Sequence, residues 1–192
     1  MIRTKTLLFT TIISLLFAYS CAPTGFTKNN HKVLVHESSK MSFPEKVSGF
    51  TRTPINVYDE SGNKVSVGYN LKTETCHLTV NIYLYPDKGG IEKHFQEVKD
   101  SIMQVNQEVK KVYEDTNYFI QEDQVVPGKK VCYRISKNMN GNQTDRMTMA
   151  YLYAFGDWII KYSVSYPSGF ESCASLKVVE LMQELECPFN ET

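Results

Sequence analysis

The sequence lacks several features that would assign it a common function. Its 192 residues include 21 basic and 21 acidic residues, so the formal net charge is zero. A chain without a strong excess of positive charge is a poor ligand for nucleic acids, and we expect no nucleic-acid partner. The sequence contains no C-x-x-C pair, no zinc-ligand spacing and no G-x-G-x-x-G loop. We therefore expect no metal, no cofactor and no enzymatic activity.

A long apolar run is also missing. The uncharged run from Leu7 to Ala18 follows Arg3 and Lys5. A helix of this length rises about 18 Å, which is short of the roughly 30 Å hydrocarbon core of a membrane. Positive residues, a short apolar run and small residues near Ser20 are the order of a signal peptide. We therefore predict that residues 1–20 are a signal peptide removed on export.

The residue after this segment is a cysteine. Residues Leu16–Cys21 resemble the bacterial lipoprotein signal, in which the cysteine is lipidated and becomes the mature N-terminus. The resemblance implies that lipid chains on Cys21 anchor the protein to a membrane. Ala18 stands where leucine is usual, so ordinary cleavage after Ser20 stays open. Ala22 lacks the acidic group that can retain lipoproteins at an inner membrane, which favours the outer membrane, facing the periplasm.

The composition changes after the first forty residues. Residues 21–42 are rich in Lys, Asn, Ser and Thr and show little periodicity. Such a composition is typical of a linker, and we predict a lipid-anchored flexible tether. Residues 43–192 are then expected to form a single globular domain, because about 150 residues suffice to bury one core.

Apolar periodicity predicts strands and a helix in the first half of this domain. Alternation over Ile55–Val57 and Val65–Leu71, with turn residues between, indicates a hairpin. Cys76–Tyr85 alternates in the same way and is predicted as a third strand. Apolar residues then recur at intervals of three and four from Ile91 to Val112, which predicts a helix that covers a sheet.

The second half repeats this order. Strands are predicted at Asn117–Val126 and Lys129–Lys137, joined at Pro127-Gly128, and Asn138–Asp145 is predicted as a polar loop. Two more strands surround Gly156-Asp157. The last element is a helix over Phe170–Glu186, for which the expected core residues are Leu176, Val179, Met182 and Leu185.

Gly156-Asp157 suits a two-residue type II′ turn, which would place Phe155 opposite Trp158. Followed outward, this register puts large side chains on one face of the hairpin and small ones on the other. The aromatic members of the large face are candidates to line a pocket for an apolar or sugar-like ligand, and packing beneath a helix is the alternative. They are Tyr151, Tyr153, Trp158, Tyr162 and Tyr166.

The expected order is β-β-β-α-β-β-β-β-α. Short connections between successive strands imply a mainly antiparallel sheet. We predict an α+β domain with a sheet of about seven strands and two helices packed on it.

Several short motifs resemble those of a widespread family of exported bacterial proteins. They are Phe43-Pro44, Gly49-Phe50 with Arg52, Tyr58-Asp59 with Gly62, Val65–Tyr69, and Thr79 through Tyr83 to Tyr85-Pro86, followed by Lys161-Tyr162 and Tyr166-Pro167. The order of strands and helices is also similar to the PsbP-like fold, whose members include photosynthetic accessory subunits and envelope proteins. The resemblance implies an exported protein of that fold and transfers no catalytic residue to this chain.

Four further cysteines, Cys76, Cys132, Cys173 and Cys187, form an even set in an exported chain. Cys173 and Cys187 would lie about 20 Å apart along the last helix, beyond the roughly 7 Å that a disulfide allows. Two arrangements stay open: Cys76–Cys173 with Cys132–Cys187, or Cys76–Cys187 with Cys132–Cys173. A third possibility is that the four cysteines are reduced and buried.

Three functions follow from these observations. We favour a membrane-anchored, non-catalytic envelope lipoprotein that binds or supports another envelope component. The first alternative is a periplasmic carrier that holds a small ligand on the aromatic face. The second is a hydrolase or redox enzyme that uses His77. His94 could also be a base, although no nucleophile motif accompanies either histidine.

Overall fold

The computed structural model describes residues 22–29, 32–106, 108–121, 124–139, 142–185 and 187. The predicted signal peptide and Cys21 lie outside these residues. Within the described part of the chain, no helix is long and apolar enough to cross a membrane.

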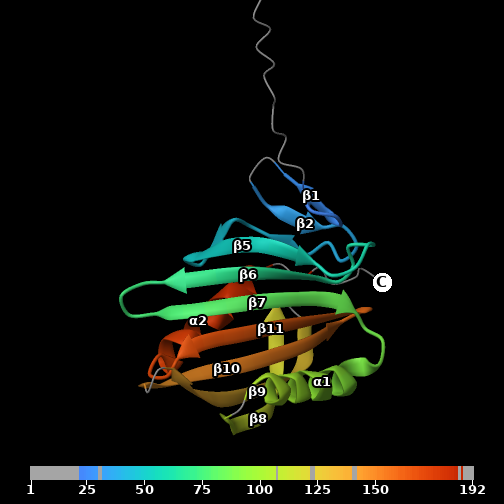
Figure 1. Ribbon diagram of the computed structural model, residues 1–192. Coiled ribbons are helices and arrows are strands. Elements are labelled where there is room, and N and C mark those ends of the chain that lie inside the picture. Colours follow the sequence, from blue (N-terminus) through green and yellow to red (C-terminus); the bar gives the residue numbers. More distant parts are fainter. Residues whose placement is uncertain are drawn as a thin grey trace, which may run out of the picture.

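The domain is built on one eight-stranded antiparallel sheet, with strand order β4-β5-β6-β7-β11-β10-β9-β8 (Figure 1). An antiparallel α+β domain is therefore confirmed, but the sheet has one strand more than predicted. Its strands are β4 Lys46–Val47, β5 Phe50–Val57, β6 Val65–Lys72, β7 His77–Pro86, β8 Glu108–Gln121, β9 Gln124–Met139, β10 Asn142–Phe155 and β11 Trp158–Pro167.

Two helices cover opposite faces of this sheet, with α1 (Gly90–Val105) in front and α2 (Glu171–Glu184) behind in Figure 1. α1 packs Phe95 and Val98 against a small cluster that includes Leu152 and Ile159. α2 packs on the larger core cluster, which holds most of the aromatic residues of the sheet. The predicted order of strands and helices along the chain is confirmed from β5 to α2.

The hairpin of β10 and β11 has the predicted register. Phe155 pairs with Trp158, Tyr153 with Ile160 and Tyr151 with Tyr162. Because successive side chains of a strand alternate between faces, this register directs the aromatic residues toward α2 and the small residues toward α1.

The first helix is shorter than predicted. α1 ends at Val105, and Asn106 has an extended backbone. The side-chain amide of Asn106 donates a hydrogen bond of 2.8 Å to the carbonyl oxygen of Ile102, which satisfies a free acceptor of the last turn. Val109 and Val112 belong to β8 instead, where β-branched residues suit a pleated strand.

The boundaries predicted for the next two strands were also wrong. β8 and β9 form a long hairpin, and Pro127-Gly128 lies inside β9, opposite Tyr118 and Asn117. A Cβ atom on Gly128 would lie 2.4 Å from the ring of Tyr153, so this glycine permits close packing and is not a turn residue. Part of the predicted loop 138–145 is strand, since Asn142 pairs with Met139.

α2 is rotated relative to the prediction. Leu176 and Val179 are 61% and 46% exposed, although both were expected in the core. The buried stripe contains Ala174, Val178 and Leu181, followed by Met182 and Leu185. A small alanine at the contact lets the helix approach the bulky aromatic face, which the apolar periodicity alone did not indicate.

The segment expected to be a flexible tether carries regular structure. A second, three-stranded sheet contains β1 Phe26–Lys28, β2 Leu34–His36 and β3 Ser42–Phe43. Phe26, His36 and Met41 are buried, and Nε2 of His36 lies 2.8 Å from the carbonyl oxygen of Gly62. These contacts hold the segment against the β5–β6 turn and the ring of Trp158. The polar composition of the segment therefore did not indicate that it packs on the domain.

One disulfide joins Cys76 to Cys173 at a Cα–Cα distance of 6.0 Å and ties the start of β7 to α2. This bond excludes the arrangement with Cys76–Cys187. Cys132 and Cys187 are buried thiols outside the bond, and Sγ of Cys187 lies 3.9 Å from the hydroxyl of Tyr162. The structure thus contains the Cys76–Cys173 bond of the first predicted arrangement, while Cys132 and Cys187 are thiols.

Gly62 is expected to be essential for docking the small sheet. Its φ is +71°, and a Cβ atom there would lie 2.7 Å from Cα of Gly25. Gly62→Ala should therefore lower the free energy of unfolding by about 1–3 kcal/mol, measured by urea denaturation with Trp158 fluorescence. Gly89→Ala is the control, because its Cβ would meet only the flexible Lys93 side chain. Equal stability of the two variants would contradict this account.

Candidate functional site

The α1 face of the sheet is polar where α1 does not cover it. Neighbouring strands β7 and β11 each direct alternate polar side chains to this face, and the opposite alternates are apolar and buried. The pairs on the polar side are Tyr83 with Lys161, Asn81 with Ser163, and Thr79 with Ser165.

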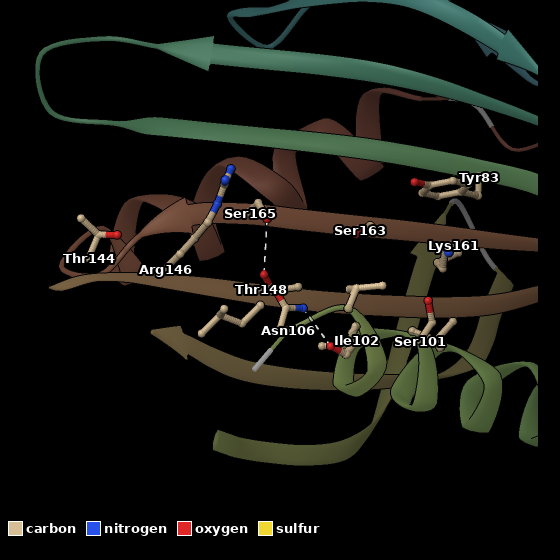
Figure 2. A pocket seen from close by; sticks show the side chains of 13 residues that line it. Tyr83, Ser101, Ile102, Asn106, Thr144, Arg146, Thr148, Lys161, Ser163 and Ser165 are labelled. Carbon is tan, nitrogen blue, oxygen red and sulfur yellow. Dashed lines mark hydrogen bonds between the residues drawn. The ribbon is translucent and has the colours of Figure 1, made fainter. Parts of the chain in front are cut away.

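Two adjoining cavities lie along this polar surface, and together they form what we name the α1-face groove. The first has a volume of about 520 Å³ and lies between the C-terminal half of α1 and the sheet (Figure 2). The second, of about 620 Å³, extends toward the β6–β7 turn and includes Lys72 and His77. Thr144, Arg146 and Ser165 line both cavities. Both volumes are within the range of small-molecule sites.

Positive charge dominates the first cavity. Lys161 and Arg146 line it, and none of its described lining residues carries a carboxylate. Figure 2 shows the two cations toward opposite ends, with Thr148 and Ser165 between them. Asp145 lines the second cavity, where its Oδ1 accepts a hydrogen bond of 2.7 Å from the hydroxyl of Ser136. The groove therefore has a net positive field that attracts anions.

Lys161 is the more buried of the two cations. Its Nζ lies 3.8 Å from the centroid of the Tyr83 ring, a cation–π contact. Burial lowers the pKa of Lys161 to about 8, because removal from water disfavours the charged form. Burial also raises the pKa of Tyr83. Within the described residues, neither Lys161 nor Arg146 forms an ion pair.

The candidate aromatic residues mostly serve the core. Tyr151, Tyr153, Tyr162 and Tyr166 are each no more than 7% exposed, and they pack in the cluster that includes α2. Trp158 is half-buried and meets the ring of His36 edge-on at 5.3 Å. This face is thus largely packed beneath α2 and beside Phe119 of β8, and packing beneath a helix was the alternative to a ligand pocket.

A hollow remains beside this covered face, between β8 and α2. It has a volume of about 380 Å³, and Tyr151 and Tyr153 form part of its wall. Tyr118 and Ile120 line it from β8 and are 61% and 60% exposed, and Val179 lines it from α2. An apolar ligand could contact two of the five candidate aromatics here.

The two histidines considered as catalytic bases lie in different environments. His77 is exposed at one end of the groove, and its ring stacks on Phe170 with a centroid distance of 6.0 Å. His94 is a buried residue of α1, 3.3 Å from carboxylate oxygens of Asp87 and Glu97, and packs on Tyr85. Among the described residues, no hydrogen bond joins either ring to a serine, threonine or cysteine side chain, which a nucleophile–base pair needs.

Asp87 binds the backbone of Gly89 and Gly90 at the start of α1. Its Oδ1 accepts hydrogen bonds from the backbone N–H groups of Gly89 and Gly90, at 3.0 and 2.7 Å. These bonds lower the pKa of Asp87, with the Gly90 N–H as the largest cause. The N-terminus of α1 is therefore capped by the chain itself. Within the described residues, no cluster of three or more His, Cys, Asp or Glu is placed to hold a metal ion.

Sequence reasoning missed the groove, although it contained a signal for it. The correct β10–β11 register already placed Thr148 with Ser165, Ala150 with Ser163, and Leu152 with Lys161 on one face. We interpreted that face only as small. A lysine among hydroxyl side chains on a strand that is otherwise buried was the indication of a polar site.

Comparisons with known proteins do not show a family for this chain. No protein-family model and no curated protein matched the chain. Among solved structures, the chain is similar to cyanobacterial PsbP (CyanoP) from Synechocystis, with 12% identity and a TM-score of 0.48. The match covers 88% of this chain and 98% of that one. The family of exported proteins suggested by the sequence motifs stays a prediction.

Removal of the buried charge should stabilise the fold. Lys161→Met is expected to raise the free energy of unfolding at pH 7 by about 1–2 kcal/mol, because folding then no longer desolvates an ammonium group. The folded native chain loses this proton near pH 8 and the unfolded chain near 10.5. The free energy of unfolding of the native protein should therefore rise between pH 8 and 10.5. The difference in stability between Lys161→Met and the native protein should become smaller over the same range.

Urea denaturation at pH 7, 8.5 and 9.5 measures this effect, with the exposed Lys46→Met as control. A Lys161→Met protein that is less stable than the native one at pH 7, or a gap that does not change with pH, would refute the assignment.

Proposed function

We propose that this chain is an exported envelope protein, held at a membrane by lipid on Cys21, that binds a polar ligand in the α1-face groove without catalysing a reaction. The positively charged, hydroxyl-lined groove carries the proposal, because Lys161 is half-buried there and no carboxylate of the described residues pairs with it. Natural proteins keep such unfavourable arrangements mainly at functional sites.

Two observations favour binding over catalysis. Among the described residues, His77 makes no hydrogen bond to a hydroxyl of the groove, so the site lacks a hydroxyl nucleophile activated by this histidine. The groove rests on paired strands and a packed helix, and a site on rigid elements suits recognition of a ligand with fixed geometry.

A second candidate function uses the hollow between β8 and α2. Its wall includes Tyr151 and Tyr153, and exposed Tyr118 and Ile120 lie at its opening. Such a surface would take an apolar ligand, as the carrier alternative requires. We rank it second because most of the aromatic face is already buried beneath α2.

A matched pair of filling mutations separates the two sites. Ser163→Trp fills the α1-face groove, and Ser175→Trp fills the β8–α2 hollow. We expect a small-molecule extract of the native envelope to shift the amide NMR signals around Thr148 and Ser163 in the native protein. Ser163→Trp should abolish these shifts and Ser175→Trp should retain them. Shifts confined to Tyr118 and Val179 would instead support the apolar carrier.

The anchor is tested separately. In the native cell, Cys21→Ser should move the protein from the membrane fraction to the soluble fraction, because no lipid is attached to serine. Mass spectrometry of the native mature N-terminus should show Cys21 with acyl chains. An unmodified N-terminus on a protein that is already soluble would contradict the anchor and leave the groove proposal standing.

A further inference from the structure

We propose that the α1-face groove takes an elongated, hydroxyl-rich anion with negative groups at separated positions, as in an acidic oligosaccharide. This inference rests on the proposed function of the groove and names the chemical class of its ligand. It follows from the charges that line the groove, from their separation and from the groups between them.

The charge of the groove selects an anion. Lys161 and Arg146 line the first cavity and Lys72 lines the second. Asp145 is the acidic group among the described lining residues of the two cavities, and the hydroxyl of Ser136 already donates to it. A neutral ligand would leave Lys161 without a counter-charge, whereas a carboxylate or phosphate group would supply one.

The separation of the two cations selects an elongated ligand. Lys161 pairs with Leu152, and Arg146 precedes Leu152 by six residues on β10. At about 3.3 Å per residue, the two backbone positions are about 20 Å apart along the strands. Figure 2 shows the side chains at opposite ends of the cavity. A single small anion therefore cannot contact both cations, and a ligand with spaced charges can.

The groups between the cations suit hydroxyl-rich chains. Ser163, Ser165 and Thr148 line the floor of the cavity, and the contact between the hydroxyls of Thr148 and Ser165 is long, at 3.4 Å. Hydroxyl groups both donate and accept hydrogen bonds, so they can pair with the hydroxyls of a sugar in either sense. The side-chain amide of Asn106 already donates a hydrogen bond to the carbonyl oxygen of Ile102 and borders the site at the end of α1.

The burial of Lys161 supports this assignment. Its ammonium group faces the ring of Tyr83, and burial has lowered its pKa to about 8. A ligand carboxylate beside it would favour the charged form, so part of the burial cost would be recovered on binding. The mutation that removes the charge should therefore weaken binding while stabilising the free protein.

Isothermal titration of the mature protein with tetragalacturonate, a chain of four uronic acids, tests the inference. Maltotetraose is the neutral comparator, and galacturonate and inorganic phosphate are the short anions. We expect tetragalacturonate to bind at least tenfold more tightly than each of these three. Lys161→Met and Arg146→Met should each weaken its binding at least tenfold, and Lys46→Met should change it less than twofold. Thermal unfolding verifies that each variant is folded.

The outcomes separate this inference from the proposed function. If maltotetraose binds as tightly as the acidic chain and shifts the NMR signals of Thr148 and Ser163, the groove is a binding site and the anionic class is wrong. If galacturonate or phosphate binds as tightly as tetragalacturonate, the inference that the groove selects an elongated ligand is wrong. If no probe binds, or if Lys161→Met and Arg146→Met behave like Lys46→Met, the inference is overturned.

Discussion

The pairing register of β10 and β11 determines which side chains lie on each face of the sheet. Phe155 opposite Trp158 places Tyr151, Tyr153 and Tyr162 on the side covered by α2. A shift of one residue would exchange the faces and expose these rings to water. The two-residue connection through Gly156-Asp157 therefore contributes both to the core and to the composition of the opposite face, where the α1-face groove lies.

The two faces differ in what they contribute to the fold and to the proposed binding site. The aromatic side supplies the larger core cluster, and the Cys76–Cys173 bond fastens α2 over it. The α1 side has a smaller cluster around Phe95 and Leu152 and leaves polar residues of β7 and β11 uncovered. Because the larger core cluster is on one side, the other side can accommodate a desolvated lysine at a cost of about 1–2 kcal/mol.

Strong local patterns predicted much of this architecture. The alternation in β6, β7 and β11 and the Gly156-Asp157 turn predicted the order of these strands along the chain and the hairpin register, but not that β7 pairs with β11. The prediction was wrong where two signals overlapped. Valines at helical spacing extended from α1 into β8, where pairing with β9 determined the structure. Pro127-Gly128 resembled a turn, yet the glycine lies against Tyr153, a contact between strands distant in sequence.

The candidate site, too, depends on contacts between segments that are distant in sequence. The aromatic residues were identified correctly as one face, but their burial depends on where α2 packs, and its own sequence suggested a different stripe. The tether was misjudged because its docking depends on the Gly25–Gly62 approach and on His36, contacts between distant segments. The groove requires β7, β10, β11 and α1 together, so the β10–β11 hairpin alone indicates its polar floor but not the cavity.

The most direct test of the central claim is a crystal structure of the mature protein grown with tetragalacturonate. We expect ligand density along the α1-face groove, with one carboxylate near Nζ of Lys161 and another near the guanidinium of Arg146. Density in the β8–α2 hollow, or an empty groove in crystals of a protein saturated with this ligand in solution, would contradict it.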